Sequence, residues 1–157
     1  MSTLLAVDLG LRTGFALYGE DGRLCWYRSQ NFGTKARLRR AARNMLADQS
    51  DLAWLIVEGG GTLADAWLKE ATRREILTQQ ISAEQWRADL LYAREQRNAS
   101  RAKQSADELA RRVIDWSEAP RPTSLRHDAA EAILIGLWGV IKVGWLSEVP
   151  PAIRLPF

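Results

Sequence analysis

The chain has 157 residues, of which 46% are hydrophobic and 26% charged, and its formal net charge is +3. These values predict one globular domain with a buried core, and with no run of 18 apolar residues we expect no membrane span. The single cysteine, Cys25, excludes an internal disulfide and a multi-cysteine zinc site, and it fits a reducing compartment such as the cytoplasm. We expect Cys25 to pack in a strand. The first residues run straight into a strand-like pattern, so we expect no signal peptide.

The first part of the chain predicts three antiparallel strands, a helix and a fourth strand. Apolar runs place the strands at 4–9, 15–18, 24–29 and 52–57. Glycine-containing turns are expected at 10–14 and 20–23. Apolar residues at helical spacing predict a helix from about 34 to 47. The continuous run at 52–57 is typical of a strand buried on both faces.

The rest of the chain is predicted to be mostly helical. A helix is expected from about 63 to 73 with Thr62 as its N-cap, followed by a short strand within 75–81. Further helices are expected at 83–91, 100–116 and 125–143, the last capped by Ser124. The tail from Pro150 onward is expected to be extended. This order of elements predicts an α/β fold with a mixed sheet.

Acidic residues lie at the edges of elements that we expect to be buried. Asp8 and Glu58 each end an apolar strand, and Asp128 and Glu131 lie three residues apart at the start of the last helix. That spacing places both helix acids on one face. Buried carboxylates are costly to desolvate unless they are compensated, and a cluster of them suits a hard divalent cation.

The residues around the helix acids carry a second signal. The helix dipole alone would explain an acid in the first turn. It does not explain the small neighbours Ala129, Ala130 and Ala132. Small residues are expected where a helix lies close to a sheet and presents its acids inward.

Basic residues form two clusters. One spans 35–43 and the other 94–103; they contain Lys35, Arg37, Arg39, Arg40 and Arg43, and Arg94, Arg97, Arg101 and Lys103. Solvated helix faces explain either cluster alone, but together with a carboxylate centre they favour a nucleic-acid partner. The pair Trp86-Arg87 could stack on a base or pack beneath the sheet, and we expect packing.

The segments 5–10, 13–14, 55–58 and 127–132, together with Ala102-Lys103, resemble nucleases of the RNase H-like (retroviral integrase) superfamily. Among these they are most similar to the RuvC-type Holliday junction resolvases, in the same order and over most of the chain to about residue 143. The resemblance implies an RNase H-like fold, with a five-stranded mixed sheet flanked by helices. We therefore expect a single nuclease domain over residues 1–157, with a core of about 3–143 and a C-terminal tail at 147–157.

The resemblance also implies a site for two Mg²⁺ or Mn²⁺ ions. Asp8 would bridge the ions, and Glu58, Asp128 and Glu131 would complete the coordination. Lys103 matches a family lysine near the scissile phosphate, and we assign substrate binding to Lys103, Arg12 and Arg101. The implied activity is the hydrolysis of phosphodiester bonds in Holliday junctions or other branched DNA, with a homodimer making the paired cuts.

Three features depart from the family pattern. Glu131 stands where the family usually has Asp, and the region between Glu58 and the next strand is shorter than in the resolvases. His127 precedes Asp128, a position at which some members have a histidine ligand, so His127 could bind metal, support a ligand or cap the helix. The alternatives are a nuclease acting on RNA or unbranched DNA, a catalytically silent nucleic-acid-binding domain, and an actin-like nucleotide-binding fragment, which would need a longer chain.

Overall fold

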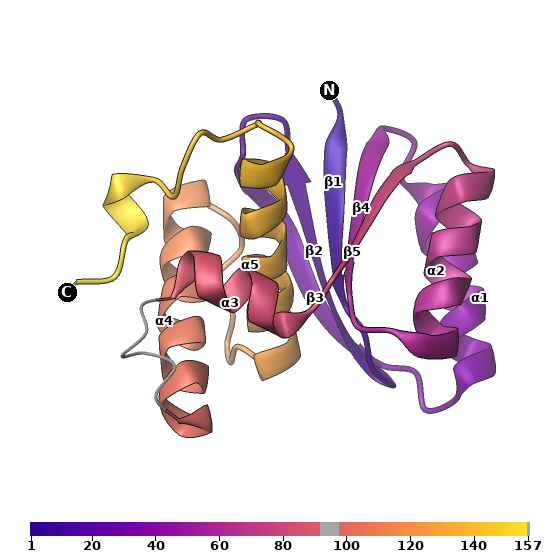
Figure 1. Cartoon of the computed structure of the whole chain (residues 1–157), viewed down its shortest axis with the longest axis horizontal. Helices are drawn as coiled ribbons and strands as arrows, with labels where there is room; N and C mark the ends of the chain where they lie inside the picture. Colours follow the sequence, from indigo (N-terminus) through magenta and orange to yellow (C-terminus); the bar gives the residue numbers. More distant parts are fainter. Residues whose placement is uncertain (92–97, 157) are drawn as a thin grey trace.

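The computed structural model describes residues 1–91 and 98–156 and contains a central five-stranded sheet (Figure 1). The strand order is β3-β2-β1-β4-β5. The strands are β1 (Thr3–Asp8), β2 (Arg12–Gly19), β3 (Leu24–Asn31), β4 (Leu52–Glu58) and β5 (Leu77–Ile81). β1 pairs antiparallel with β2 and parallel with β4, so the sheet is mixed. The predicted α/β class with a five-stranded mixed sheet is confirmed.

Helices cover both faces of the sheet (Figure 1). α1 (Lys35–Asp48) and α2 (Gly61–Arg73) lie on one face; α3 (Ala83–Leu90), α4 (Ala99–Ser117) and α5 (His127–Lys142) lie on the other. Alternate residues of β1 enter the two cores, with Leu4 in the α5 core and Leu5 in the α1–α2 core. Among the described residues, no helix combines the length and apolar character needed to cross a bilayer.

α5 lies directly against the sheet because glycines remove side chains at the points of contact. A Cβ atom at Gly136 would lie 2.2 Å from the Tyr18 ring, and one at Gly139 would lie 3.0 Å from Ile56. The buried Tyr18 hydroxyl donates a hydrogen bond to the carbonyl of Ile133 in the same helix. These contacts fix both the height and the register of α5 on the sheet.

Several element boundaries differ from the sequence predictions. The turn expected at 10–14 is shorter, because β2 already begins at Arg12, which pairs with Asn31 of β3. α2 begins at Gly61 with Gly60 as its N-cap, in place of Thr62. Neither the start of β2 at Arg12 nor the N-cap at Gly60 has a side chain typical of such a boundary.

The start of α5 and the C-terminal tail also differ from expectation. α5 begins at His127 after the N-cap Arg126, which makes no side-chain capping bond, so the prediction of Ser124 as cap was wrong. The tail is not extended throughout, because Pro151–Ile153 form a 3₁₀ turn with Ile153 buried. Cys25 lies in β3 as expected, but its side chain is exposed, so the expected packing was wrong.

Candidate metal centre

Three carboxylates converge at one edge of the sheet. Asp8 and Glu58 end the neighbouring parallel strands β1 and β4 and are paired in register. Glu131 comes from α5, which begins at the same end of the molecule (Figure 1). Each of these residues offers an oxygen atom, and the three oxygens lie within 4.8 Å of one another. The structure therefore brings together three of the four acids that the sequence singled out.

The close approach of α5 depends on Gly14. This residue pairs with Asp8 across β1 and β2. A Cβ atom at Gly14 would lie 1.9 Å from the backbone carbonyl oxygen of Asp128. The first turn of α5 therefore rests on bare backbone beside Asp8, and the adjacent Ala129 and Ala130 are buried as expected. This contact carries Glu131 into the cluster.

The charge on Asp8 is strongly disfavoured in the absence of a cation. Burial is the largest of several causes that together raise the pKa of Asp8 from its ordinary value near 3.8 to about 9. The other causes are repulsion by the nearby Glu58 carboxylate, a hydrogen bond with it, and repulsion by Glu131 and Asp128. At neutral pH Asp8 therefore retains a proton that a divalent cation could replace.

Protein groups already hold the two helix acids. Glu131 is 5% exposed. Its Oε1 atom lies 3.0 Å from Nη2 of Arg87 and 2.6 Å from Nε2 of His127. Asp128 accepts a 2.5 Å hydrogen bond from the Ser29 hydroxyl and lies outside the group of three converging carboxylates. Of the roles considered for His127, the structure shows contact with Glu131, while the N-cap of α5 is Arg126.

The basic residues assigned to substrate binding are exposed. Arg101 and Lys103 lie in the first two turns of α4, and Arg12 begins β2. No ion pair involves these three side chains in the part of the chain that the structure describes. Arg94 and Arg97 of the same basic cluster lie outside the described residues. Contact of Arg12, Arg101 and Lys103 with a nucleic acid stays a prediction.

Sequence reasoning missed two residues of the site, Arg87 and Ser29. Their partners lie 44 and 99 residues further along the chain, so no local spacing indicates either contact. Arg87 drew attention only as the neighbour of Trp86. Trp86 is fully buried, so the expectation that it packs is confirmed. Arg87 instead reaches the carboxylate cluster from α3.

No family model matches the chain, and no curated protein sequence matches it. Among solved structures, RuvC from T. thermophilus in complex with a Holliday junction substrate is similar, with a TM-score of 0.64 and 15% identity over 92% of this chain and 98% of that one. The yeast mitochondrial Holliday junction resolvase Ydc2 is similar with a TM-score of 0.53 and 12% identity, over 92% of this chain and 82% of that one. The chain therefore has the RNase H-like fold of the RuvC-type resolvases, and the resemblance read from the sequence is confirmed at the level of the fold.

Proposed function

We propose that the chain is a divalent-metal-dependent endonuclease that resolves Holliday junctions or other branched DNA. The convergence of Asp8, Glu58 and Glu131 at the edge of an RNase H-like sheet carries this proposal. Two structurally similar proteins are junction resolvases, one of them in complex with its junction substrate, which supports branched DNA as the substrate class. We further propose that residues 1–157 form one nuclease domain.

The donor set fits a hard cation. All three converging ligands are carboxylate oxygens, which Mg²⁺ and Mn²⁺ prefer. The raised pKa of Asp8, caused first by burial and then by the Glu58 carboxylate, shows that a charged Asp8 is disfavoured at this position without a cation. We propose that Asp8, Glu58, Asp128 and Glu131 would hold two such ions. When bound, such ions would supply an activated water and stabilise the charge on the leaving oxygen.

The surrounding residues orient the ligands and the substrate. Arg87 and His127 fix Glu131, and Ser29 fixes Asp128, so both helix acids are in place before an ion binds. We propose that Lys103, Arg101 and Arg12 bind phosphates beside the site. A homodimer would supply the two active sites that paired cuts in opposed strands require.

The test is cleavage of a labelled synthetic four-way junction with Mg²⁺ or Mn²⁺, beside linear duplex, single-stranded DNA and an RNA–DNA hybrid. We expect paired symmetric nicks in the junction alone. Asp8→Asn should lower the cleavage rate at least about a thousandfold, because it removes the shared carboxylate. Asp48→Asn is the matched control, since Asp48 is an exposed acid at the end of α1, and it should cleave normally.

The other substrates decide between the alternatives. Metal-dependent cleavage of the hybrid or the linear duplex would support the proposed metal site and contradict branched DNA as the preferred substrate. Junction binding without cleavage of any substrate, with either metal, would establish a catalytically silent nucleic-acid-binding domain and contradict the enzyme proposal. Binding of Asp8→Asn to the junction, measured in parallel, separates a loss of chemistry from a loss of affinity.

A further inference from the structure

α1 carries five exposed cations that form no ion pair among the described residues. They are Lys35, Arg37, Arg39, Arg40 and Arg43. No ion pair involves any of them in the described part of the chain. The helix contains no acidic residue before Asp48. The positive charge of the molecule is therefore concentrated on this helix without internal compensation.

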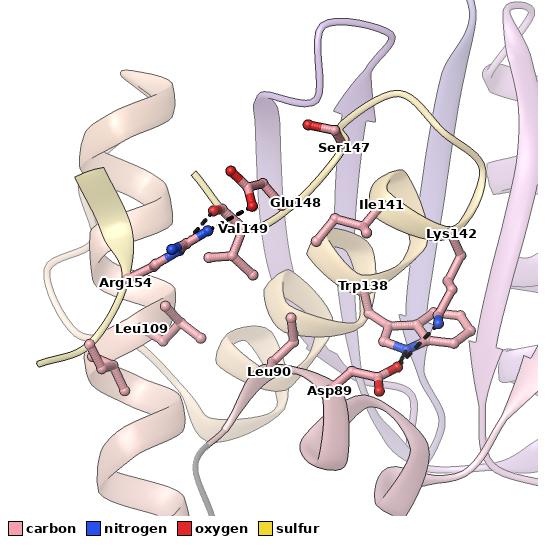
Figure 2. A pocket seen from close by; sticks show the side chains of 11 residues that line it. Asp89, Leu90, Leu109, Trp138, Ile141, Lys142, Ser147, Glu148, Val149 and Arg154 are labelled. Atoms are coloured by element: carbon pink, nitrogen blue, oxygen red, sulfur yellow. Dashed lines mark hydrogen bonds and ion pairs between the residues drawn. The ribbon is translucent and has the colours of Figure 1, made fainter. Parts of the chain in front are cut away.

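Elsewhere in the described part of the chain, eight of fifteen Lys and Arg side chains form ion pairs. Around a cavity of about 460 Å³ between α3, α4, α5 and the tail, Lys142 pairs with Asp89 at 3.4 Å and Arg154 pairs with Glu148 at 2.9 Å (Figure 2). Trp138 adds a 2.7 Å hydrogen bond to the same Asp89. Ion pairs also involve arginines at the end of α2 and within α4, namely Arg73, the C-cap residue Arg74, Arg111 and Arg112. The unpaired cations of α1 are thus not a general property of this surface.

The positions of these cations do not favour the helix itself. Lys35 and Arg37 are the first and third residues of α1, where the positive end of the helix dipole repels cations. Lys35, Arg39 and Arg43 recur every four residues, at a rise of about 6 Å, and like charges at this spacing repel one another. The buried residues of α1 are Leu38, Ala42 and Leu46, so none of the five cations is needed in the core. These charges therefore do not stabilise the helix, and they are available to an anionic partner.

A cleft beside α1 extends the basic surface toward α2. It has a volume of about 350 Å³, and Arg39, Arg43 and Lys69 line it. Asp65 and Glu70 stand on its α2 wall. Glu70 already accepts hydrogen bonds from Arg73 of its own helix and from the C-cap residue Arg74, so its charge is neutralised there. The side chains that line the cleft therefore carry a net positive charge.

This surface begins next to the carboxylate cluster. The Phe32 N–H donates a 2.8 Å hydrogen bond to the Leu11 carbonyl, which ties the segment before α1 to the turn after Asp8. Arg12 directly follows Leu11 in the chain, and Lys35 follows Phe32 by three residues. The starts of α1 and α2 and the ends of β1 and β4 lie at one end of the molecule (Figure 1).

We propose that α1 is a second DNA-binding surface, which holds the phosphate backbone of a duplex arm that leaves the carboxylate edge. The inference rests on the proposed function. Lys35, Arg39 and Arg43 form its line of phosphate contacts. Arginine suits this role because its planar fork binds two phosphate oxygens at once. Contacts of this kind position the nucleic acid without reading its sequence, as a junction resolvase with varied arms requires.

The test compares two triple variants with the same change in net charge. Lys35→Gln/Arg39→Gln/Arg43→Gln removes the unpaired line, and Arg73→Gln/Arg111→Gln/Arg121→Gln removes exposed arginines that are ion-paired. Affinity for a fluorescent four-way junction is measured in chelator from 50 to 300 mM salt, and thermal melting confirms that both variants fold. The α1 variant should lose about 2–3 from the slope of log affinity against log salt, and bind roughly tenfold or more weakly at 100 mM salt. The control should change the slope by less than about 1.

Equal slopes in the two triple variants would overturn the inference. So would a defect of the α1 variant that is confined to polyglutamate or to vesicles containing phosphatidylserine, with junction binding unchanged. Cleavage by the wild type reports separately on the proposed function. A wild type that cleaves junctions, with no effect of the α1 changes, would overturn only the second surface. An α1-dependent salt slope without any cleavage would retain that surface and contradict the nuclease.

Discussion

The acids of the two strands and the acids of α5 lie under opposite conditions. Asp8 and Glu58 face each other on neighbouring strands, and no ion pair involves either one among the described residues. Glu131 has Arg87 and His127 beside it, and Asp128 has the Ser29 hydroxyl. The helix acids are therefore positioned by the protein, whereas the strand acids are left with a charge that only an ion or a proton can balance.

This difference suggests that the helix acids and the strand acids contribute differently to a metal site. Groups with fixed partners need no rearrangement when an ion arrives, so they set the geometry. Groups without partners destabilise the folded chain until the ion arrives, so they supply the binding free energy. Removing the charge of a strand acid should therefore raise the stability of the metal-free chain. Removing the partner of a helix acid should lower it.

The largest effect is expected at the strand pair. In chelator, Asp8→Asn should raise the free energy of unfolding by on the order of 3 kcal/mol at pH 8. The pKa of Asp8 is raised to about 9 in the folded chain, so the folded state retains a proton that the unfolded state releases. Wild-type stability should therefore fall as the pH rises from about 4 to about 9, and the variant should lack this component of the fall. Urea unfolding at several pH values measures both.

Two controls accompany this prediction. Asp48→Asn removes an exposed carboxylate and should leave the pH dependence of stability as in the wild type. Saturating Mg²⁺ should stabilise the wild type more than Asp8→Asn and narrow the gap between them. If the free energies of unfolding of the wild type and Asp8→Asn differ by the same amount at pH 5 and pH 8, the charge on Asp8 does not destabilise the folded chain.

The next effect is expected where the helix acids reach the sheet. Gly14→Ala should lower the free energy of unfolding by about 2–3 kcal/mol, because its Cβ would meet the backbone of Asp128 and not a flexible side chain. Cleavage should fall as well, since α5 must move away from Asp8. Gly60→Ala is the control: its nearest neighbour would be the Gln80 amide at 3.7 Å, and we expect a loss within about 1 kcal/mol. Similar losses in both variants would contradict a tight contact at Gly14.

The sequence predicted the parts of this arrangement that depend on local pattern. Apolar runs marked the strands, and the alanines around Glu131 indicated a helix lying close to the sheet. The helix starts at Gly61 and His127 were missed because their N-caps make no side-chain capping bond. Arg87 could not be assigned to the cluster, since its contact with Glu131 is set by how α3 packs on α5 and not by any spacing along the chain.

Arg87→Gln should leave Glu131, like the strand acids, without an arginine to balance its charge. The nearly buried Glu131 would lose its guanidinium, and we expect stability in chelator to fall by about 2 kcal/mol. Mn²⁺ should restore part of that loss, because an ion would compensate the same carboxylate. Arg111→Gln removes an exposed pair with Asp107 and should cost less than about 0.5 kcal/mol, unaffected by metal. Equal losses in the two variants would show that Arg87 does not balance a buried charge.

The smallest effect is expected at Ser29, and it decides the role of Asp128. Ser29→Ala removes the 2.5 Å hydrogen bond to the carboxylate and should cost about 1 kcal/mol of stability. If Asp128 is a ligand, the Mg²⁺ concentration for half-maximal cleavage should rise several-fold, while Ser29→Thr, which keeps the hydroxyl, should stay close to the wild type. Comparing Ser29→Ala with Ser29→Thr separates the effect of the hydroxyl on the orientation of Asp128 from a general effect of substitution in β3. If Ser29→Ala leaves the metal dependence unchanged, Asp128 serves only to complement the start of α5, and the three converging carboxylates are the whole of the site.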